Sequence, residues 1–255
     1  MATEAPGRGS HVTCVSWRPI PVRHDRVARQ GYPRGVADRN RTKVLLVGAG
    51  GHARVLLDVL LADDREVVGA AARGTTGPLA DGVPMLGSDE EAPGIAREQG
   101  VDQICVAIGD NAVRRRISQS LEAAGLQLVS TIHPSAVVAG SVHLAGGVQI
   151  LPAVVVNARA RLGKGTIVNS GAVIEHDARI GEYCHIAPGA VLGGDVVVGD
   201  GTLLGIGSRV VPGVTIGREA VVGAGATVIR DVPDGHRVAG VPAQPLAQHA
   251  KESGS

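Results

Sequence analysis

The residues with the most evident chemistry are a Glu-His-Asp triplet at 175–177 and a second histidine, His185. A histidine ring accepts and releases a proton near neutral pH, and a neighbouring carboxylate can orient the ring and raise its basicity. Either Glu175 or Asp177 could supply that carboxylate. The triplet therefore predicts a general base at His176. The alternative is that both histidines are exposed corner residues that only keep the surface polar.

A glycine-rich turn, Gly48-Ala-Gly-Gly-His-Ala53, stands between a short apolar segment and a segment of helical length. It fits the pattern G-x-G-x-x-A, in which backbone N–H groups at a helix N-terminus hold a phosphate. His52 could donate to the same phosphate. The acid that would bind a ribose about 20 residues further on is missing, because Ala72 and Arg73 stand there. NAD is therefore disfavoured, whereas a nucleotide diphosphate and a turn built only for packing both remain open.

A third group, Gly109, Asp110 and Asn111, follows an apolar segment that is typical of a strand. Ligands of open α/β sheets lie beyond the carboxyl ends of the strands, so these residues are expected beside the glycine-rich turn. An N-cap for the following helix explains Asp110 or Asn111 equally well. The two roles do not exclude each other.

The triplet lies within a strict six-residue repeat, since an aliphatic residue recurs at every sixth position from Ile132 to Val228, seventeen times without interruption. No α-helix has a period of six and a simple strand has a period of two, so the repeat indicates a parallel β-helix of hexapeptide rungs. Three rungs make one coil, and residues 18 apart stack on one another. Because no insertion interrupts the repeat, one chain cannot close a pocket by itself, and a site between associated copies is expected.

Upstream of the repeat, short apolar segments alternate with helical ones, which predicts a small parallel α/β domain, half the size of a dinucleotide-binding fold. The expected strands are 43–47, 66–70, 83–87, 103–108 and 126–129, and the expected helices are 54–61 and 111–124. The predicted organisation is a flexible basic extension over 1–41, the α/β domain over 42–130, the β-helix over 131–246 with a cap from 231, and a tail over 247–255.

Composition excludes several classes of protein. A net charge of +1 argues against nucleic acid as a partner. Three scattered cysteines without a CxxC pair suggest a reducing cytoplasm and disfavour a structural zinc site. No apolar run has the length of a membrane span and no signal peptide is visible. The chain lacks Phe, so its core must be built from aliphatic residues.

Four segments together carry a resemblance to a known family: GAGGHARV from Gly48, IGDNAVRRRI from Ile108, IHPSA from Ile132 and VNSGAVIEHDARIGEYCHIAPGAVLGG from Val168. The chain resembles the sialic-acid O-acetyltransferase and UDP-4-amino-sugar N-acetyltransferase group of left-handed β-helix hexapeptide acyltransferases. The resemblance covers about residues 43–246. It implies a homotrimer that binds acetyl-CoA between neighbouring β-helices and takes a nucleotide-linked amino sugar in the α/β domain.

The resemblance also implies roles for single residues. His176 matches the catalytic base, and Asp177 matches the acidic residue that supports it. His185 matches a histidine that contacts the cofactor, and backbone atoms at Ile206 and Ala224 match the coenzyme path. Residues that match the nucleotide-sugar pocket are Gly50, Gly51, His52 and Gly109. An acidic pair that this family usually carries after the second strand is replaced by Ala72 and Arg73, which puts a uridine nucleotide in doubt.

We therefore predict a cytoplasmic, metal-independent enzyme that transfers acetyl from acetyl-CoA to an amine of a nucleotide-activated sugar. Three alternatives remain. Acetylation of a hydroxyl group, as on sialic acid, would use the same base. A non-catalytic trimeric scaffold would not bind acetyl-CoA. A regulatory protein would bind a nucleotide without turnover.

Overall fold

The structure is a computed structural model of the 255-residue chain that describes residues 41–74, 77–80 and 82–246. The predicted extension over 1–41, apart from Arg41, and the predicted tail over 247–255 lie outside the described residues. None of the described helices is long and apolar enough to cross a membrane.

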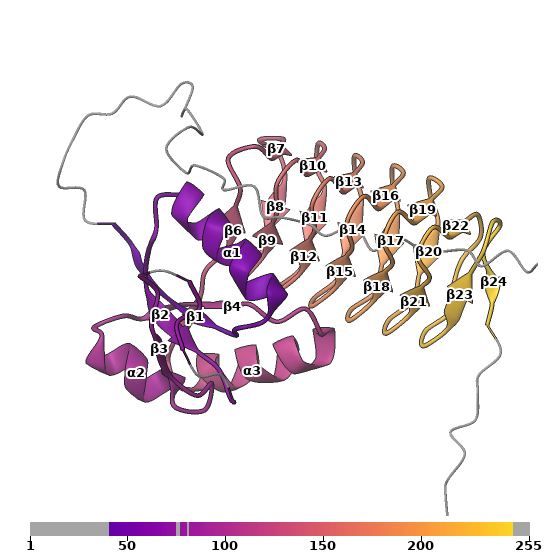
Figure 1. The fold of residues 1–255 in the computed structure, drawn as a ribbon. Coiled ribbons are helices and arrows are strands. Elements are labelled where there is room, and N and C mark those ends of the chain that lie inside the picture. The colour runs from indigo at the N-terminus through magenta and orange to yellow at the C-terminus, as the bar shows by residue number, and fades with distance from the viewer. Residues whose placement is uncertain (1–40, 75–76, 81, 247–255) are drawn as a thin grey trace, which may run out of the picture. The chain divides into compact units, whose positions relative to one another are not determined.

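The first half of the described chain is a five-stranded parallel sheet of order β3-β2-β1-β4-β5 (Figure 1). Its strands are β1 (Lys43–Val47), β2 (Glu66–Ala71), β3 (Met85–Gly87), β4 (Gln103–Val106) and β5 (Gln127–Leu128). Its helices are α1 (Gly51–Ala62), α2 (Ala92–Glu98) and α3 (Asn111–Ala123). Alternate residues of β1 point to opposite faces, as in any strand. Val44 and Leu46 pack with α1, whereas Leu45 and Val47 pack with α2 and α3. The sheet is therefore covered on both sides.

Helix α2 has no counterpart among the expected elements. It has seven residues, with a proline in its first turn and Gly94 inside it, and so it lacks a helical repeat of apolar residues. Burial of Ala92, Ile95 and Ala96 against the sheet stabilises it instead.

The second half consists of seventeen two-residue strands, and each ends on one aliphatic residue of the six-residue repeat. Parallel pairing joins residues 18 apart, such as Val155 with Val173. The strands stack into three faces. The first face holds β6 (Thr131–Ile132), β9 (Gln149–Ile150), β12 (Ile167–Val168), β15 (His185–Ile186), β18 (Leu203–Leu204) and β21 (Val221–Val222). The second face holds β7 (Val137–Val138), β10 (Val155–Val156), β13 (Val173–Ile174), β16 (Val191–Leu192), β19 (Arg209–Val210) and β22 (Thr227–Val228). The third face holds β8 (His143–Leu144), β11 (Arg161–Leu162), β14 (Arg179–Ile180), β17 (Val197–Val198) and β20 (Thr215–Ile216).

Each corner of the coils needs one residue with positive φ. Every sixth residue from Gly147 to Gly225 has this conformation, and most of these residues are glycine. The conformation is easy for glycine and strained for residues with a Cβ. Asp177, with φ of 62°, is among the exceptions.

The segment after the repeat extends the stack before closing it. Val232 bridges Ile216 in parallel, and β23 (Arg237–Ala239) continues the first face by pairing with β21. Only then does β24 (Gln244–Pro245) turn back, antiparallel to β23.

The α/β domain packs on the first face of the β-helix. Leu151 and Ile167 from the coils share one buried cluster with Leu56 and Leu60 of α1. The coil interior is a separate core of aliphatic residues, Ala and Cys184, as expected for a chain without Phe.

Candidate active site

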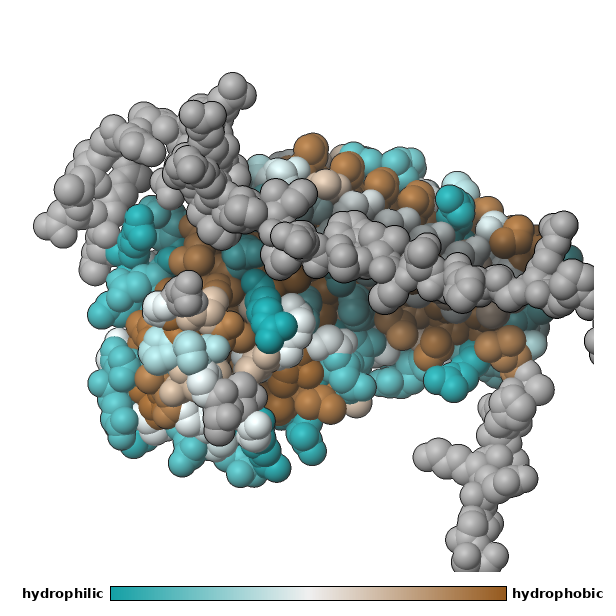
Figure 2. All heavy atoms as spheres, viewed as in Figure 1, coloured by the Kyte–Doolittle hydropathy of each residue, from teal (hydrophilic) through white to brown (hydrophobic). Residues whose placement is uncertain are grey.

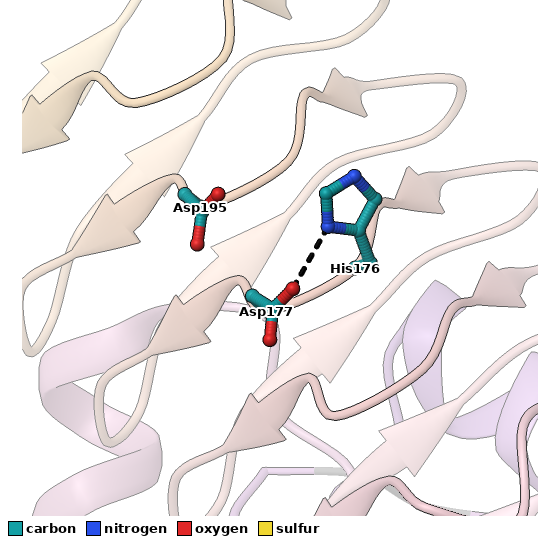
Figure 3. A group of neighbouring side chains, drawn as sticks. All are labelled: His176, Asp177 and Asp195. Carbon is teal, nitrogen blue, oxygen red and sulfur yellow. Dashed lines mark hydrogen bonds and ion pairs between the residues drawn. The ribbon is translucent and has the colours of Figure 1, made fainter.

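His176 lies in the turn between β13 and β14, at the corner that joins the second face to the third. Its Nδ1 is 2.9 Å from Oδ2 of Asp177 (Figure 3). Arg159, one coil earlier, donates from Nε and Nη2 to the two oxygens of Asp177 at 2.6 and 2.8 Å. The side chain of His176 is 57% exposed. Among the described residues no hydrogen bond engages its Nε2, so this atom is available to a substrate.

The electrostatics of the corner suit a general base. The hydrogen bond that His176 donates to Asp177, followed by the charges of Asp177, Asp195 and Glu175, raises the pKa of His176 above its ordinary value. Hydrogen bonds from Arg159 and then His176 hold the pKa of Asp177 well below its usual range. Asp177 is therefore ionised at neutral pH. It keeps Nδ1 of the ring protonated and leaves Nε2 as the proton acceptor.

Gly194 makes room for the ring. It stacks one coil after His176, and a Cβ at this position would lie 2.6 Å from Cε1 and 2.7 Å from Nε2 of the ring. These distances are shorter than any ordinary contact. The position of His176 thus depends on the absence of a side chain at residue 194.

The two carboxylates that flank His176 have different partners. Glu175 accepts a hydrogen bond from Nδ2 of Asn157 at 2.9 Å and does not bind the ring. Of the two candidates, Asp177 is the one that orients the histidine.

His176, Asp177 and Asp195 each place one ligand-type atom within 4.8 Å of the others, and Figure 3 shows the three side chains on adjoining turns. A metal ion here would compete with Arg159 and His176 for the oxygens of Asp177. The observed hydrogen bonds favour an acid–base role for this group over a metal site.

A second group of polar residues lies where the α/β domain meets the first face. Nε2 of His52 is 2.8 Å from Oε1 of Gln149, and Nε2 of Gln149 donates to the carbonyl of Val106 at 2.8 Å. The latter bond fixes the Gln149 amide, so Nε2 of His52 is the donor. Burial lowers the pKa of His52. A neutral His52 has no further N–H to give a phosphate, and the contact favours a role in positioning the glycine-rich turn.

His185 lies where the coils meet Gly109 of the α/β domain. Asn169 accepts from the backbone N–H of Ser170 at 2.8 Å, so its Nδ2 is the atom that donates to Nε2 of His185 at 3.1 Å. The carbonyl of Gly109 lies close enough to the ring to oppose the lowering of its pKa. Burial, and then the positive charge of Arg114, lowers the pKa of His185 to about 4. His185 is therefore neutral at physiological pH and ties the α/β domain to the coils.

The remaining predicted pocket residues divide into two kinds. Asp110 caps α3 by accepting from the N–H of Val113 at 2.8 Å, and Asn111 donates to the carbonyl of Gly201 at 2.9 Å. Gly50 and Gly51, in contrast, begin α1 without a side-chain cap, and a Cβ added at either residue would meet nothing within 4 Å. Their backbone is the part of this region that is open to a phosphate.

The predicted coenzyme residues, Ile206 and Ala224, stack one coil apart at the corner that joins the first face to the second, where Gly225 donates to the carbonyl of Ile206 at 2.8 Å. Ile206 is 62% exposed, and Ala224 is exposed too. His176 belongs to the next corner of the same chain. The fold thus brings His176 together with Asp177. It also brings His52, His185 and Gly109 together where the α/β domain meets the first face. The predicted coenzyme path at Ile206 and Ala224, however, lies at a different corner from His176.

A shallow hollow of about 600 Å³ lies at the carboxyl ends of β2 and β3 and includes Ala72, Gly74 and Ser88 in its lining. Arg73, beside it, forms ion pairs with Glu90 and, at 3.4 Å, with Asp89. The acids next to this hollow therefore come from the segment before α2 and not from the end of β2.

Sequence reasoning missed several members of the site. Arg159 and Asp195 stand 18 residues before and after Asp177, and Gly194 stands 18 residues after His176, so the coil spacing could have found all three. No such signal exists for the contacts of Gln149 with His52 and Val106, because they depend on how the α/β domain docks.

Two family models match parts of the chain. Residues 43–121 match the model of the PglD N-terminal domain. Residues 159–194 and 195–230 match that of the bacterial transferase hexapeptide. No curated protein matches the chain by sequence.

Among solved structures, the chain is similar to a GDP-perosamine N-acetyltransferase from Caulobacter crescentus in complex with CoA and GDP-perosamine, in a form in which one histidine is replaced by alanine. The two are 43% identical over 80% of this chain and 96% of the other, with a TM-score of 0.77. The acetyltransferase domain of PglB from Neisseria gonorrhoeae, in complex with acetyl coenzyme A, is 34% identical over 81% of this chain and 100% of the other, with a TM-score of 0.77.

The fold and the matches define an acyltransferase with a left-handed β-helix of hexapeptide repeats. Within that class, the chain belongs to the family of acetyl-CoA-dependent sugar acetyltransferases that carry a PglD N-terminal domain. The family, the fold class and the enzyme class predicted from the sequence are confirmed.

Proposed function

We propose that this enzyme transfers the acetyl group of acetyl-CoA to an amine of a nucleotide-activated amino sugar, with His176 as the general base. The observation that carries the proposal is the chain of contacts from Arg159 through Asp177 to Nδ1 of His176, which leaves Nε2 exposed as a proton acceptor. Similarity to an enzyme bound to CoA and GDP-perosamine supports the choice of substrates.

In the proposed reaction the sugar nitrogen attacks the thioester carbonyl and forms a tetrahedral intermediate. Nε2 of His176 takes one proton from that nitrogen, and Asp177 stabilises the imidazolium. The intermediate collapses to the amide and expels the CoA thiolate, which receives the proton. General-base assistance of this kind is typically worth about 10² to 10⁴ in rate. No step requires a metal ion.

The α/β domain is the proposed site of the nucleotide. The uncapped first turn of α1 at Gly50 and Gly51 suits the diphosphate, because its N–H groups and helix dipole favour an anion. Gly109 follows β4, the strand that neighbours β1, and would line the same pocket. A GDP-linked amino sugar is the first candidate, given the ligand of the Caulobacter relative.

A second copy of the chain is proposed to complete the site. The coenzyme path at Ile206 and Ala224 and the base at His176 occupy different corners of one β-helix, so a neighbouring β-helix in a homotrimer would bring them together. Hydrophobic side chains form a row along the edge that carries β7, β10, β13 and β16 (Figure 2). The stacked Val137 and Val191 on this second face are exposed. Burying such a row favours self-association.

The deciding assay combines acetyl-CoA with CMP-, GDP-, UDP- and dTDP-linked amino sugars and measures release of free thiol. One of these sugars should give turnover with the wild type, and His176→Ala should lose about 10² to 10⁴ in kcat while binding acetyl-CoA normally. Near-normal kcat in His176→Ala would remove His176 from the mechanism.

Product analysis separates the alternatives. Amide and ester products differ in stability to hydroxylamine, so an ester would establish a hydroxyl acceptor. Nucleotide binding without turnover of any acceptor would instead establish a regulatory protein. If acetyl-CoA failed to bind, the result would favour the non-catalytic trimeric scaffold. The cytoplasm, which contains both substrates, is the proposed location.

A further inference from the structure

Arg114 of α3 is a fully buried cation at the junction of the two halves of the enzyme. Its Nε donates to the carbonyl of Gly165 at 2.8 Å, and its Nη2 donates to the carbonyls of Tyr183 and Cys184 at 3.1 and 3.0 Å. These three acceptors belong to the β-helix. The guanidinium therefore holds two successive coils at once.

The same guanidinium also holds the pocket loop of the α/β domain, which we define as residues 108–111. Nη1 of Arg114 donates to the carbonyls of Ile108 and Gly109 at 3.0 and 3.1 Å, and Nη2 donates to Oδ1 of Asn111 at 2.8 Å. One rigid, planar group thus fixes the pocket loop relative to the coils.

None of these hydrogen bonds goes to a carboxylate. Burial lowers the pKa of Arg114 to about 10, so the group remains charged at neutral pH. Burying a cation without a hydrogen-bonded counterion costs free energy, because the charge loses its contact with water. An apolar residue could pack between the two halves at a lower cost in free energy. The number of carbonyls that converge on the guanidinium explains why an arginine stands here.

The contacts of Arg114 meet at His185. Cys184, whose carbonyl binds the guanidinium, immediately precedes His185. Gly109, whose carbonyl also binds the guanidinium, lies close enough to the His185 ring to influence its pKa. Arg114 consequently holds both partners of the contact between His185 and the pocket loop.

We propose that Arg114 is a positioning residue that sets the pocket loop against the coil carrying His185 and so places the acceptor sugar for transfer. This inference rests on the proposed function insofar as it concerns the acceptor. Arg114 contacts neither His176 nor the corner at Ile206, and Asn169 holds the His185 ring without it. Substitution of Arg114 should therefore leave proton transfer and coenzyme binding unchanged.

The test compares Arg114→Lys with Arg115→Lys. Arg115 is a matched control, because it also ties α3 to the β-helix, through Glu219 at 2.9 Å, but has no hydrogen bond to the pocket loop. A lysine at 114 keeps the charge and cannot span six acceptors. Arg114→Lys should raise the KM for the nucleotide sugar at least tenfold. The KM for acetyl-CoA should change by less than twofold and the inflection of the pH profile should stay in place, whereas Arg115→Lys should resemble the wild type in all three.

Hydrogen–deuterium exchange supplies a readout that needs no substrate. The peptide that covers the pocket loop should exchange faster in Arg114→Lys than in the wild type and in Arg115→Lys. Arg114→Gln, which removes the charge and keeps an NH₂ donor, serves as a second variant if Arg114→Lys does not melt cooperatively, with the same pattern expected.

Two results would overturn the inference: unchanged exchange of the pocket loop together with an unchanged acceptor KM, or equal effects of the substitutions at 114 and 115. A different result would separate the two proposals. If the wild type acetylates no amino sugar but the pocket loop still exchanges faster in Arg114→Lys, the proposed function is overturned and the positioning role stands.

Discussion

Gly194→Ala is the most direct test of whether the position of His176 matters. The new Cβ would lie 2.6 Å from Cε1 of the ring, whereas ordinary contacts begin at 3.4 Å. The ring must therefore retreat by about 0.8 Å, and a misplacement of about 1 Å can cost a catalytic group about 10² in rate. The ring is an exposed, flexible side chain and can move without disturbing the coil. We expect kcat to fall about a hundredfold while the melting temperature and the KM for acetyl-CoA stay near the wild-type values.

The matched control is Gly140→Ala. Gly140 occupies the same corner of the β-helix three coils earlier, and nothing lies within 4 Å of a Cβ there. This variant should have wild-type kcat. A kcat within threefold of wild type for Gly194→Ala, measured at saturating concentrations of both substrates, would refute the view that the ring acts from its observed position. A fall in melting temperature would show that the coil, not the ring, had moved.

The hydrogen bond to Asp177, together with its charge, raises the pKa of His176. A general base works only when neutral, so kcat/KM should fall as the pH drops through that raised pKa. Asp177→Asn, which keeps an acceptor for Nδ1 and tolerates positive φ, should lower kcat and move this acid limb to lower pH; an unmoved limb would exclude Asp177. His185, with a pKa of about 4 when folded and about 6.5 when unfolded, should cause stability to fall as the pH drops from 6.5 to 4, because the unfolded chain takes up the proton first. Melting temperatures of His185→Gln should show a shallower pH dependence over that interval, and an identical slope would contradict the assignment. Activity should survive EDTA, since Arg159 and His176 already bind the oxygens of Asp177; loss of activity that Zn²⁺ or Mg²⁺ restores would show that a metal acts there.

The β-helix could be predicted from the sequence almost residue by residue. Its signal is local and periodic, because every rung repeats the same packing problem and solves it with the same residue types. The seventeen aliphatic positions from Ile132 to Val228 are the second residues of the seventeen strands. Helix α2 escaped prediction because tertiary burial, not a local repeat, stabilises it.

The candidate site could be predicted only in part. The pairing of His176 with Asp177 follows from their adjacency, and His176, Asp177 and His185 remain proposed site residues. The hydrogen bond that holds His52 joins residues far apart in sequence, because its partner is Gln149. It depends on the docking of one domain on another, for which the chain carries no periodic signal. The boundary between the α/β domain and the β-helix at residue 130 stays a prediction.

The corners of the β-helix repeat from coil to coil along its axis. The proposed catalytic group could therefore stand on another coil with the same surroundings. Asp195 already stands one coil after Asp177, so a histidine at residue 194, an arginine at 177 and a glycine in place of Pro212 would reproduce the same local geometry about 4.8 Å further from the α/β domain. The choice of coil thus sets the distance between the bound end of the proposed acceptor and its reacting atom. That distance could be changed without redesigning either end.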